Sequence, residues 1–431
     1  YSTPGPSIRL IALAYALLDT LHSLDFLHSK FISYFENHGY LLQIFDNMIG
    51  MEKTVFDKKR TSGDRETAMY AFESLMSLLT RFAQSKKGCD TLIRNGLLNK
   101  LSKCSLLDVP PLMAIDVLQQ PDEYSRIPSS LEEEKTSAWI KHLSVPILRL
   151  VCTTMLILPD NKRVAEEVLF FVLANKKALS SRLESLALTS SPMHLQQLEE
   201  IRLITLIFLM LGSHYELIVK FSQNKLVKWE LRMIKALECC TSMLKQIEEK
   251  NSGSSRVNSD GSGDLMLMDS DEDLSRLPMG ILENGHDIPR LLCGISRNVI
   301  SYIRKVGIRR PDNMFFSAEW TSASKRLTVK KMKQQATMNA LMELCEFHIS
   351  AIKSSTEQYE HTSLKFMETR SDSLQERMKR LAEQLHSHFF LVENGLHVLF
   401  THLDYYCTSH LKIMGEVQSG SDEQRAVKEE R

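Results

Sequence analysis

The chain has 431 residues, 53 basic and 53 acidic side chains, and a hydrophobic fraction of 43%. This balance excludes a chain that is disordered throughout, and it lacks the basic excess of a dedicated nucleic-acid binder. Leucine occurs 62 times and valine 18 times, beside only 17 glycines and 12 prolines. Because leucine suits helices and β-branched valine does not, these counts predict an all-α protein. The length suits about three domains or one repeat array.

Cysteine usage and the longest apolar run indicate the environment of the chain. The eight cysteines are scattered without a CxxC pair, which predicts buried free thiols in a reducing compartment. The chain does not begin with methionine, so we expect a fragment of a longer protein, and no signal peptide is visible. The run Leu203 to Leu211 is shorter than the about 20 residues that cross a bilayer. We therefore expect a buried helix there and no direct membrane insertion.

Apolar residues recur at helical spacing from the start of the chain. The first predicted helix repeats them at Leu10, Ala14, Leu17, Leu21 and Leu24. A later helix has one apolar face and is predicted to end near 86–88; this face consists of Ala68, Phe72, Leu75, Met76, Leu79 and Phe82. A short helix over 89–94, the dipeptide Asn95-Gly96 and a helix over 97–104 follow. Armadillo and HEAT-type repeats have this layout, in which a long helix, a break, a short helix, a glycine and a further helix follow one another.

A five-residue pattern of two apolar residues, one charged residue and Asn-Gly occurs three times, at 92–96, 281–285 and 391–395. Glycine after asparagine permits positive φ, so each copy predicts a turn that lets the next helix fold back. The copies share no fixed period. We therefore predict an irregular HEAT/armadillo-like α-solenoid, with three coincidental helix ends as the alternative.

Composition changes divide the rest of the chain. Residues 105–137 contain four prolines and predict an extended loop, and Pro146 is predicted to kink the helix that follows. Residues 251–273 are rich in glycine, serine and acidic residues, so no core can form there. The predicted organisation is a first solenoid part over 1–250, a disordered acidic linker over 251–273, C-terminal tail helices over 274–414 and a flexible tail over 415–431.

The motifs of common catalytic sites are missing from the sequence. It contains no phosphate-binding loop and no GxSxG elbow, so we predict neither an enzyme, a cofactor nor a small-molecule substrate. On a helix, His386 and His388 point about 200° apart, which favours core or interface histidines over a metal site. Cys239 and Cys240 diverge by about 100°, which predicts one core thiol and one half-exposed thiol.

Two charged segments suggest weaker interpretations. The basic stretch over 304–333 contains interleaved aromatic residues, as nucleic-acid contacts or nuclear import signals do. We favour a solvated helix face with a loop that complements the acidic segment 260–273, and we expect no nucleic-acid partner. Ser270 precedes three acidic residues and is a candidate phosphorylation site for an acid-directed kinase.

The last predicted helices are dense in aromatic residues and histidines. They form either a groove for the amphipathic helix of a partner or the terminal core of the solenoid. Because a solenoid end has no following repeat to cover its last face, we predict a partner-binding surface here. The candidate partner-binding residues are Phe389, Phe390, His397, Phe400, Tyr405 and Tyr406.

Three segments, 71–104, 146–152 and 165–173, resemble in order and spacing the C-terminal part of the large inner-ring scaffold nucleoporins, the adaptor family of the nuclear pore complex. The resemblance extends over about residues 65–215. It implies a non-enzymatic α-solenoid at the nuclear pore complex of the nuclear envelope, contributing to pore assembly and nucleocytoplasmic transport. It implies other nucleoporins as partners, notably the inner-ring linker nucleoporin, whose short helices dock on tail regions of the family.

Three alternatives remain open. A karyopherin-like or armadillo cargo adaptor, or a related protein-interaction adaptor, would carry a regular repeat of about 40 residues with ladders of tryptophan and asparagine. The three tryptophans here, Trp139, Trp229 and Trp320, share no period. An enzyme on a helical scaffold would need convergent ionisable groups, which the sequence does not offer. The sister large nucleoporin of the same ring is the third alternative.

Overall fold

The computed structural model describes residues 8–25, 30–57, 60–108, 143–188, 195–222, 227–254, 287–307, 316–317 and 336–429. These residues are almost entirely helical, which confirms the predicted all-α class. The two strands in this part of the chain, β1 (Phe316–Ser317) and β2 (Ala336–Thr337), have two residues each and pair in parallel. The chain divides into unit 1, residues 1–232 and 283–291, and unit 2, residues 233–282 and 292–431.

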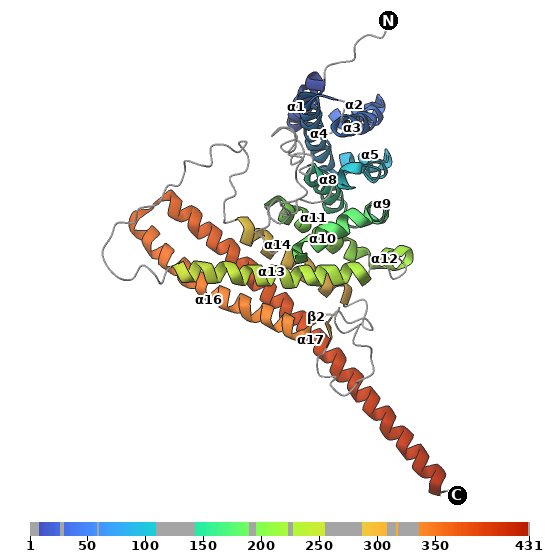
Figure 1. Ribbon diagram of the computed structural model, residues 1–431, viewed down its shortest axis with the longest axis vertical. Coiled ribbons are helices and arrows are strands. Elements are labelled where there is room, and N and C mark those ends of the chain that lie inside the picture. The colour runs from blue at the N-terminus through green and yellow to red at the C-terminus, as the bar shows by residue number, and fades with distance from the viewer. Residues whose placement is uncertain are drawn as a thin grey trace, which may run out of the picture. The chain divides into compact units, whose positions relative to one another are not determined.

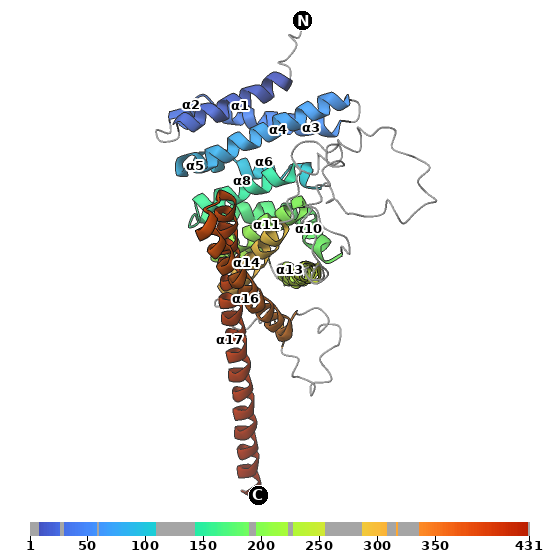
Figure 2. The same cartoon turned by 90° about the vertical axis from the view of Figure 1, so that its left-hand side faces the viewer.

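Unit 1 contains two rows of helices that alternate along the chain (Figure 1). The first row consists of α1 (Ile8–Asp25), α4 (Ser62–Ala83), α8 (Ser144–Ile157) and α11 (Leu195–Leu211). These four helices lie one above another in Figure 2, and each contacts the next. The second row consists of α2 (Lys30–Asn37), α3 (Tyr40–Phe56), α5 (Lys86–Arg94), α6 (Leu97–Leu101), α9 (Lys162–Ala174) and α12 (Tyr215–Ser222). Two stacked rows of unequal helices form an irregular solenoid of the HEAT/armadillo type.

Three shorter elements and one long helix complete unit 1. They are η1 (Ser105–Asp108), α10 (Lys176–Leu188), η2 (Gly212–His214) and the first turns of α13 (Val227–Ser254). The buried helix that the sequence predicted at 203–211 lies within α11, and η2 separates α11 from α12. By length and composition alone, Leu195–Phe221 would suffice to cross a membrane, yet 56% of its most apolar stretch is buried inside the fold. This burial agrees with the predicted core helix.

The local signals around α4 and α5 explain their bounds. Thr61 caps α4 by accepting a hydrogen bond from the Asp64 N–H at 3.2 Å, and every predicted apolar residue of α4 is at most 1% exposed. The Ser85 hydroxyl accepts from the Gly88 N–H at 3.0 Å, so residues 86–88 begin α5, whereas the sequence predicted that they end α4. Gly96 has φ 80°, which confirms the predicted turn before α6.

A further expectation for unit 1 was wrong in detail. Pro146 was predicted to kink its helix, but α8 begins at Ser144, so the proline lies in the first turn. At that position its missing N–H would have had no intrahelical partner, and the helix loses no hydrogen bond.

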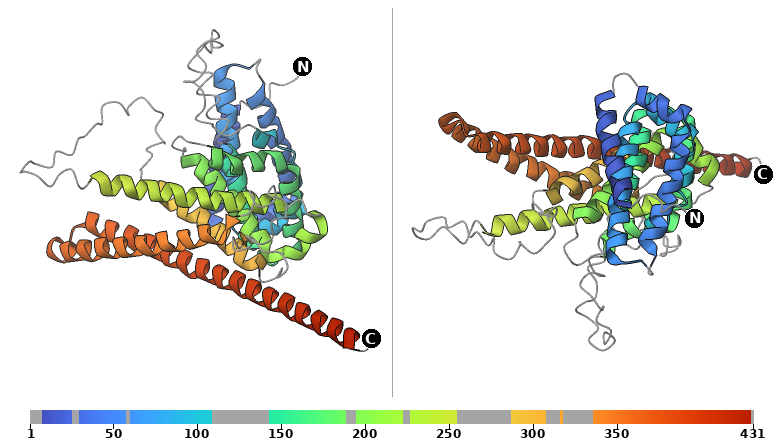
Figure 3. Two further views of the ribbon diagram at one scale, coloured as in Figure 1. Left: turned by 60° about the horizontal axis from the view of Figure 1, so that its bottom comes forward. Right: turned by 90° about the horizontal axis from the view of Figure 1, so that it is seen from above.

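Unit 2 contains the rest of α13, most of α14 (Asp287–Gly307) and a long antiparallel hairpin. The hairpin consists of α16 (Met338–Thr369) and α17 (Asp372–Glu429), which lie side by side in Figures 1 and 3. Arg370 makes the connection with φ 49°, in the left-handed region. Because α17 has 58 residues and α16 has 32, α17 continues well beyond its partner.

Three sequence expectations for unit 2 differ from the structure. Asn394-Gly395 was predicted as a turn but lies inside the continuous helix α17. The helix also runs through 415–429, which the sequence assigned to a flexible tail, and α13 includes residues 251–254 of the predicted linker. The remaining linker with Ser270, the Asn-Gly at 284–285, residues 109–137 and most of the basic stretch lie outside the described residues.

Candidate functional site

Helix α17 carries all six of the partner-binding residues that the sequence suggested. Phe389 is 56% exposed and Phe400 is 65% exposed. They are eleven residues apart, which brings them to within about 20° of each other around the helix. Leu403, at 44% exposure, extends the same face. We call Phe389, Phe400 and Leu403 the outward stripe of α17.

The other predicted residues have different surroundings. Phe390 is half-buried, with its ring centroid 4.4 Å from the guanidinium carbon of Arg297 on α14, a cation–π contact. His397 is exposed beside the outward stripe, and Tyr405 is half-buried. The side chain of Tyr406 lies outside the described residues. The sequence thus indicated an aromatic-rich part of α17, in which Phe389 and Phe400 are the phenylalanines that the structure exposes.

The opposite face of α17 holds the helix in place. Gly395 lies so close to α16 that a Cβ atom there would be 2.8 Å from the Cys345 sulfur. Asn394 donates its side-chain N–H to the Phe390 carbonyl at 2.8 Å and accepts from Arg304 of α14 at 2.6 Å. These contacts fix the rotation of α17 and thereby direct the outward stripe to solvent.

A buried histidine pair joins α16 to α17 near the same place. The Nδ1 atoms of His348 and His388 are 2.8 Å apart, so one ring donates a hydrogen bond to the other. Burial lowers the pKa of both rings below the ordinary 6.5, and the charge of His388 lowers the pKa of His348 further. Both rings are therefore neutral at pH 7. His386 is exposed, so it diverges from His388 as the spacing predicted.

The tautomers of this pair follow from its hydrogen bonds. The Nε2 atom of His348 is buried and has no partner among the described residues. A buried N–H without a partner is rarer than a buried acceptor without one. We therefore assign the Nδ1–H donor to His348, which leaves its Nε2 as a bare acceptor. No group of three or more metal-ligating side chains gathers anywhere in the described part of the chain.

The cysteines of the described helices are free thiols. Cys240 is buried and Cys239 is half-buried, which confirms the predicted pair of one core thiol and one half-exposed thiol. Burial raises the pKa of both thiols, and the neighbouring Glu238 adds to the shift at Cys239. Protonated thiols of this kind are weak nucleophiles, so these cysteines serve packing.

Unit 1 exposes a second apolar surface, along α1. Five leucines that recur every three or four residues are 51–80% exposed: Leu10, Leu13, Leu17, Leu21 and Leu24. The buried side chains of this helix include Tyr15 and His22 instead. The helical period of the sequence was therefore right, but the leucine face lies at the surface of the unit. Apolar surface of this extent is typical of an interaction site.

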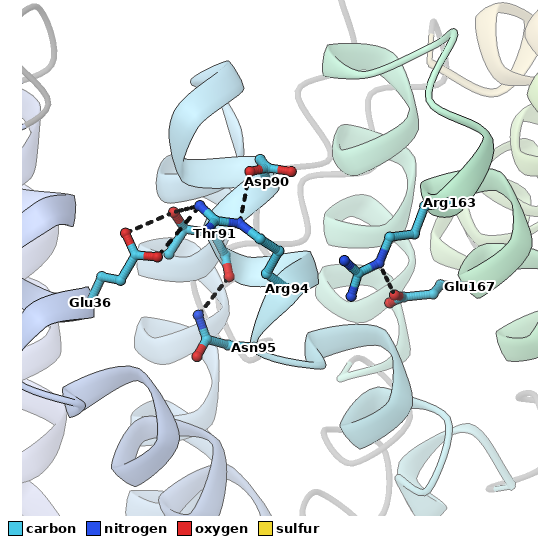
Figure 4. A network of polar contacts seen from close by, with 7 residues as sticks. All are labelled: Glu36, Asp90, Thr91, Arg94, Asn95, Arg163 and Glu167. Atoms are coloured by element: carbon cyan, nitrogen blue, oxygen red, sulfur yellow. Dashed lines mark hydrogen bonds and ion pairs between the residues drawn. The ribbon is translucent and has the colours of Figure 1, made fainter.

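A third surface feature is a recess between α5, α6 and α9, also within unit 1. Arg94 and Arg163 lie on its two sides (Figure 4). Arg94 is turned to Asp90, 2.9 Å away, and to Glu36, 3.4 Å away, whereas Arg163 bonds to Glu167 at 3.2 Å. Sequence reasoning did not find this recess, because its two sides come from segments that are far apart in the chain and carry no shared motif.

Comparison with known proteins gives one family match. Residues 8–211 match the sequence model of the family described as nuclear pore complex scaffold, nucleoporins 186/192/205. The chain is similar to the nuclear pore complex protein Nup205 of Homo sapiens, with 32% identity over 99 residues, or 23% of this chain and 5% of that protein. Nup205 of Drosophila melanogaster is 25% identical over 203 residues, 47% of this chain and 9% of that protein. The matches thus span less than a tenth of each relative.

Proposed function

We propose that this chain is a non-enzymatic scaffold segment of the inner ring, because residues 8–211 match the sequence model of the nuclear pore scaffold family of nucleoporins 186/192/205. In this proposal the protein is part of the nuclear pore complex. In the proposed role the chain holds a neighbouring nucleoporin, and in this way it contributes to pore assembly and nucleocytoplasmic transport. The partner in this proposal is the linker nucleoporin of the inner ring.

The observation that carries the docking role is the outward stripe of α17. Phe389, Phe400 and Leu403 lie on one face of a helix whose other face already packs on α16 and α14. Aromatic side chains on a rigid helix lose little conformational freedom on binding, so they are efficient anchors. A partner helix with apolar residues at i, i+3, i+4 and i+7 would cover this stripe.

Substitution of the two exposed rings tests this proposal. We expect Phe389→Ala and Phe400→Ala each to weaken capture of a linker-nucleoporin peptide by about 1–2 kcal/mol, the range of moderate interface anchors. Isothermal titration calorimetry with the 431-residue chain measures the loss. Because both rings are more than half exposed, the thermal midpoint is expected to stay the same.

A matched control is Phe56→Ala on α3 of unit 1, where the side chain is 39% exposed. This substitution should leave capture unchanged. If both α17 variants bind the peptide as the unsubstituted chain does, the docking surface is elsewhere and only the scaffold assignment stands.

A further inference from the structure

Helix α1 has a buried face and an exposed apolar face on nearly opposite sides. On the buried face, the ring of His22 meets that of Phe82 of α4 with centroids 4.8 Å apart, and the Tyr15 hydroxyl accepts from Asn47 of α3 at 3.1 Å. Residues two positions apart on an α-helix point about 160° apart, which places the exposed leucines on the other side. We call these five residues the leucine face of α1: Leu10, Leu13, Leu17, Leu21 and Leu24.

The position of α1 in the first row explains what kind of element would cover this face. Both α4 and α8 have a row neighbour on each of two sides, whereas α1 is the outermost helix of the row (Figure 2). The leucine face is 51–80% exposed, so none of the described helices of unit 1 covers it. One more helix beside α1 would continue the row and bury the leucines.

The spacing of the leucines indicates which helix fits. Counted from Leu17, they lie at −7, −4, 0, +4 and +7, so the spacing reads the same in both directions along α1. A two-fold axis beside Leu17 therefore brings Leu10 of one copy level with Leu24 of the other, and Leu13 level with Leu21. This self-complementarity is the requirement for an isologous contact between two copies of one chain.

The charges at the ends of α1 favour an antiparallel orientation of the two copies. The same two-fold axis brings Arg9 of one copy level with Asp25 of the other, a basic residue with an acidic one. A parallel pair would instead bring Arg9 level with Arg9 and Asp25 level with Asp25. It would also align the two helix dipoles, whereas an antiparallel pair opposes them.

The area of the leucine face is enough for a weak dimer. Burying the exposed parts of five leucines removes on the order of 500 Å² per copy from water, or about 1,000 Å² in total. That total lies at the lower limit of specific protein–protein contacts. We therefore expect a dimer with a dissociation constant in the range of about 1–100 μM.

We propose that unit 1 binds unit 1 of a second copy through the leucine faces of two antiparallel α1 helices, with the two-fold axis beside Leu17. The contact would join the first rows of the two copies end to end. In this way one scaffold segment would bind another without any residue of the outward stripe of α17.

Sedimentation equilibrium of the 431-residue chain at about 1–100 μM tests the proposal. We expect a reversible equilibrium between monomer and dimer. Leu17→Glu should weaken the dimer at least about 30-fold, because the two-fold axis brings both introduced carboxylates together at the centre of the contact. Since Leu17 is 56% exposed, the helix content and thermal midpoint of the monomer should stay the same.

Leu156→Glu on α8 is the matched control. Leu156 is 57% exposed and also belongs to unit 1, so the substitution adds the same charge at a leucine of nearly equal exposure. This variant should dimerise as the unsubstituted chain does. Capture of the linker-nucleoporin peptide should be the same in Leu17→Glu and Leu156→Glu, so this inference and the α17 proposal fail separately.

Cysteine variants in a Cys407→Ser background test the orientation, since Cys407 is an exposed native thiol. A short bis-maleimide should join two Leu17→Cys chains. It should not join two Leu10→Cys chains, because the antiparallel register separates those residues by about 21 Å along the helices. A mixture of Leu10→Cys and Leu24→Cys chains should give the mixed dimer.

Three outcomes would overturn the inference. The first is a chain that stays monomeric up to about 100 μM. The second is equal dimerisation of Leu17→Glu and Leu156→Glu, and the third is equal cross-linking of Leu10→Cys and Leu17→Cys. Hydrogen–deuterium exchange of the α1 peptide adds a further arm. Its protection by the linker-nucleoporin peptide, but not by raising the concentration of the chain, would assign the leucine face to that partner and would also overturn the inference.

Discussion

Unit 1 and unit 2 each contain the pattern of two apolar residues, one charged residue and Asn-Gly. In both, the asparagine side chain donates to the carbonyl four residues earlier at 2.8 Å, Asn95 to Thr91 and Asn394 to Phe390. The glycines then differ. Gly96 has φ 80° in open space and ends a helix, while Gly395 stays inside α17, where its missing Cβ makes room for the Cys345 sulfur. The same local sequence therefore serves a turn in one unit and close helix packing in the other.

The buried polar contacts also differ between the two units. In unit 1, Arg182 and Glu200 form an ion pair at 2.9 Å, with both side chains at most 5% exposed, and Arg182 also donates to the Leu107 carbonyl at 2.7 Å. In unit 2, the corresponding contact is the neutral His348–His388 pair. We expect unit 1 to depend on charge balance and unit 2 to depend on pH.

The largest expected effect is the loss of charge balance in unit 1. Arg182→Met should destabilise this unit by about 3–5 kcal/mol, because it leaves the Glu200 carboxylate buried without its cation. Hydrogen–deuterium exchange of the α8, α10 and α11 peptides measures the loss. The double substitution Arg182→Met with Glu200→Leu should recover much of it, since no buried charge remains. Equal losses in the single and double variants would show that the pair acts through packing alone.

Acidification should have its main effect in unit 2. The folded-state pKa values of His348 and His388 lie below 6.5. Below pH 6.5 the unfolded chain therefore binds more protons than the folded chain, and the free energy of unfolding decreases as the pH is lowered. At about 1.4 kcal/mol per pH unit for each ring, the loss between pH 6.5 and 5 is about 2 kcal/mol per histidine. Burial raises the pKa of Glu200 in unit 1, so this carboxyl contributes in the opposite direction.

Exchange of the α16 and α17 peptides at pH 7 and pH 5, corrected for the intrinsic exchange rate, tests the pH dependence. The double variant His348→Leu with His388→Leu should lose most of the acid sensitivity of these peptides, while His402 of α17, whose pKa is also lowered by burial, retains part of it. If the variant and the unsubstituted chain respond equally to acid, other groups control the opening of the hairpin.

The comparison also shows how much the sequence was able to predict. The buried face of α4 and the turn at Gly96 depend on contacts within a few residues or on backbone conformation, so local periodicity and turn chemistry identified them. The role of Gly395 depends on Cys345, fifty residues earlier, and no local signal reports that neighbour. Likewise the leucine period of α1 indicated a helix but not that its leucine face lies at the surface.

The candidate sites also combine features that local sequence indicates with features that depend on distant residues. Aromatic density in the sequence indicated a surface on α17, and its partner-binding role stays a prediction. Phe389 and Phe390 are about 100° apart on the helix, so only one of them can face solvent fully. Which one does so is set by the packing of Arg297 and Arg304 from α14. The recess in unit 1 gave no signal in the sequence, because its lining residues come together only when α6 packs against α9.

A smaller effect is expected at the turn glycine of unit 1. Gly96→Ala should cost about 1–2 kcal/mol, because a residue with a Cβ is strained in the left-handed region. Chemical denaturation measures the change. The surrounding space is open, so no neighbouring side chain causes the strain, and trimming Leu98 or Leu101 should not restore the stability. A neutral Gly96→Ala would mean that the turn tolerates another backbone conformation.

The smallest net effect is expected at the packing glycine of unit 2, where two contributions oppose each other. Gly395→Ala gains about 1 kcal/mol of helix propensity, but its Cβ would lie 2.8 Å from the Cys345 sulfur, and overpacking costs about 1–3 kcal/mol. The substitution should therefore be neutral or mildly destabilising in the unsubstituted chain. In a Cys345→Ala background the sulfur is gone, so the same substitution should stabilise the hairpin by up to about 1 kcal/mol. This reversal of sign in a double-mutant cycle would separate a packing glycine from a turn glycine, since no neighbour can relieve the strain at Gly96. If Gly395→Ala destabilises both backgrounds equally, the close approach of α16 and α17 is not what requires glycine at this position.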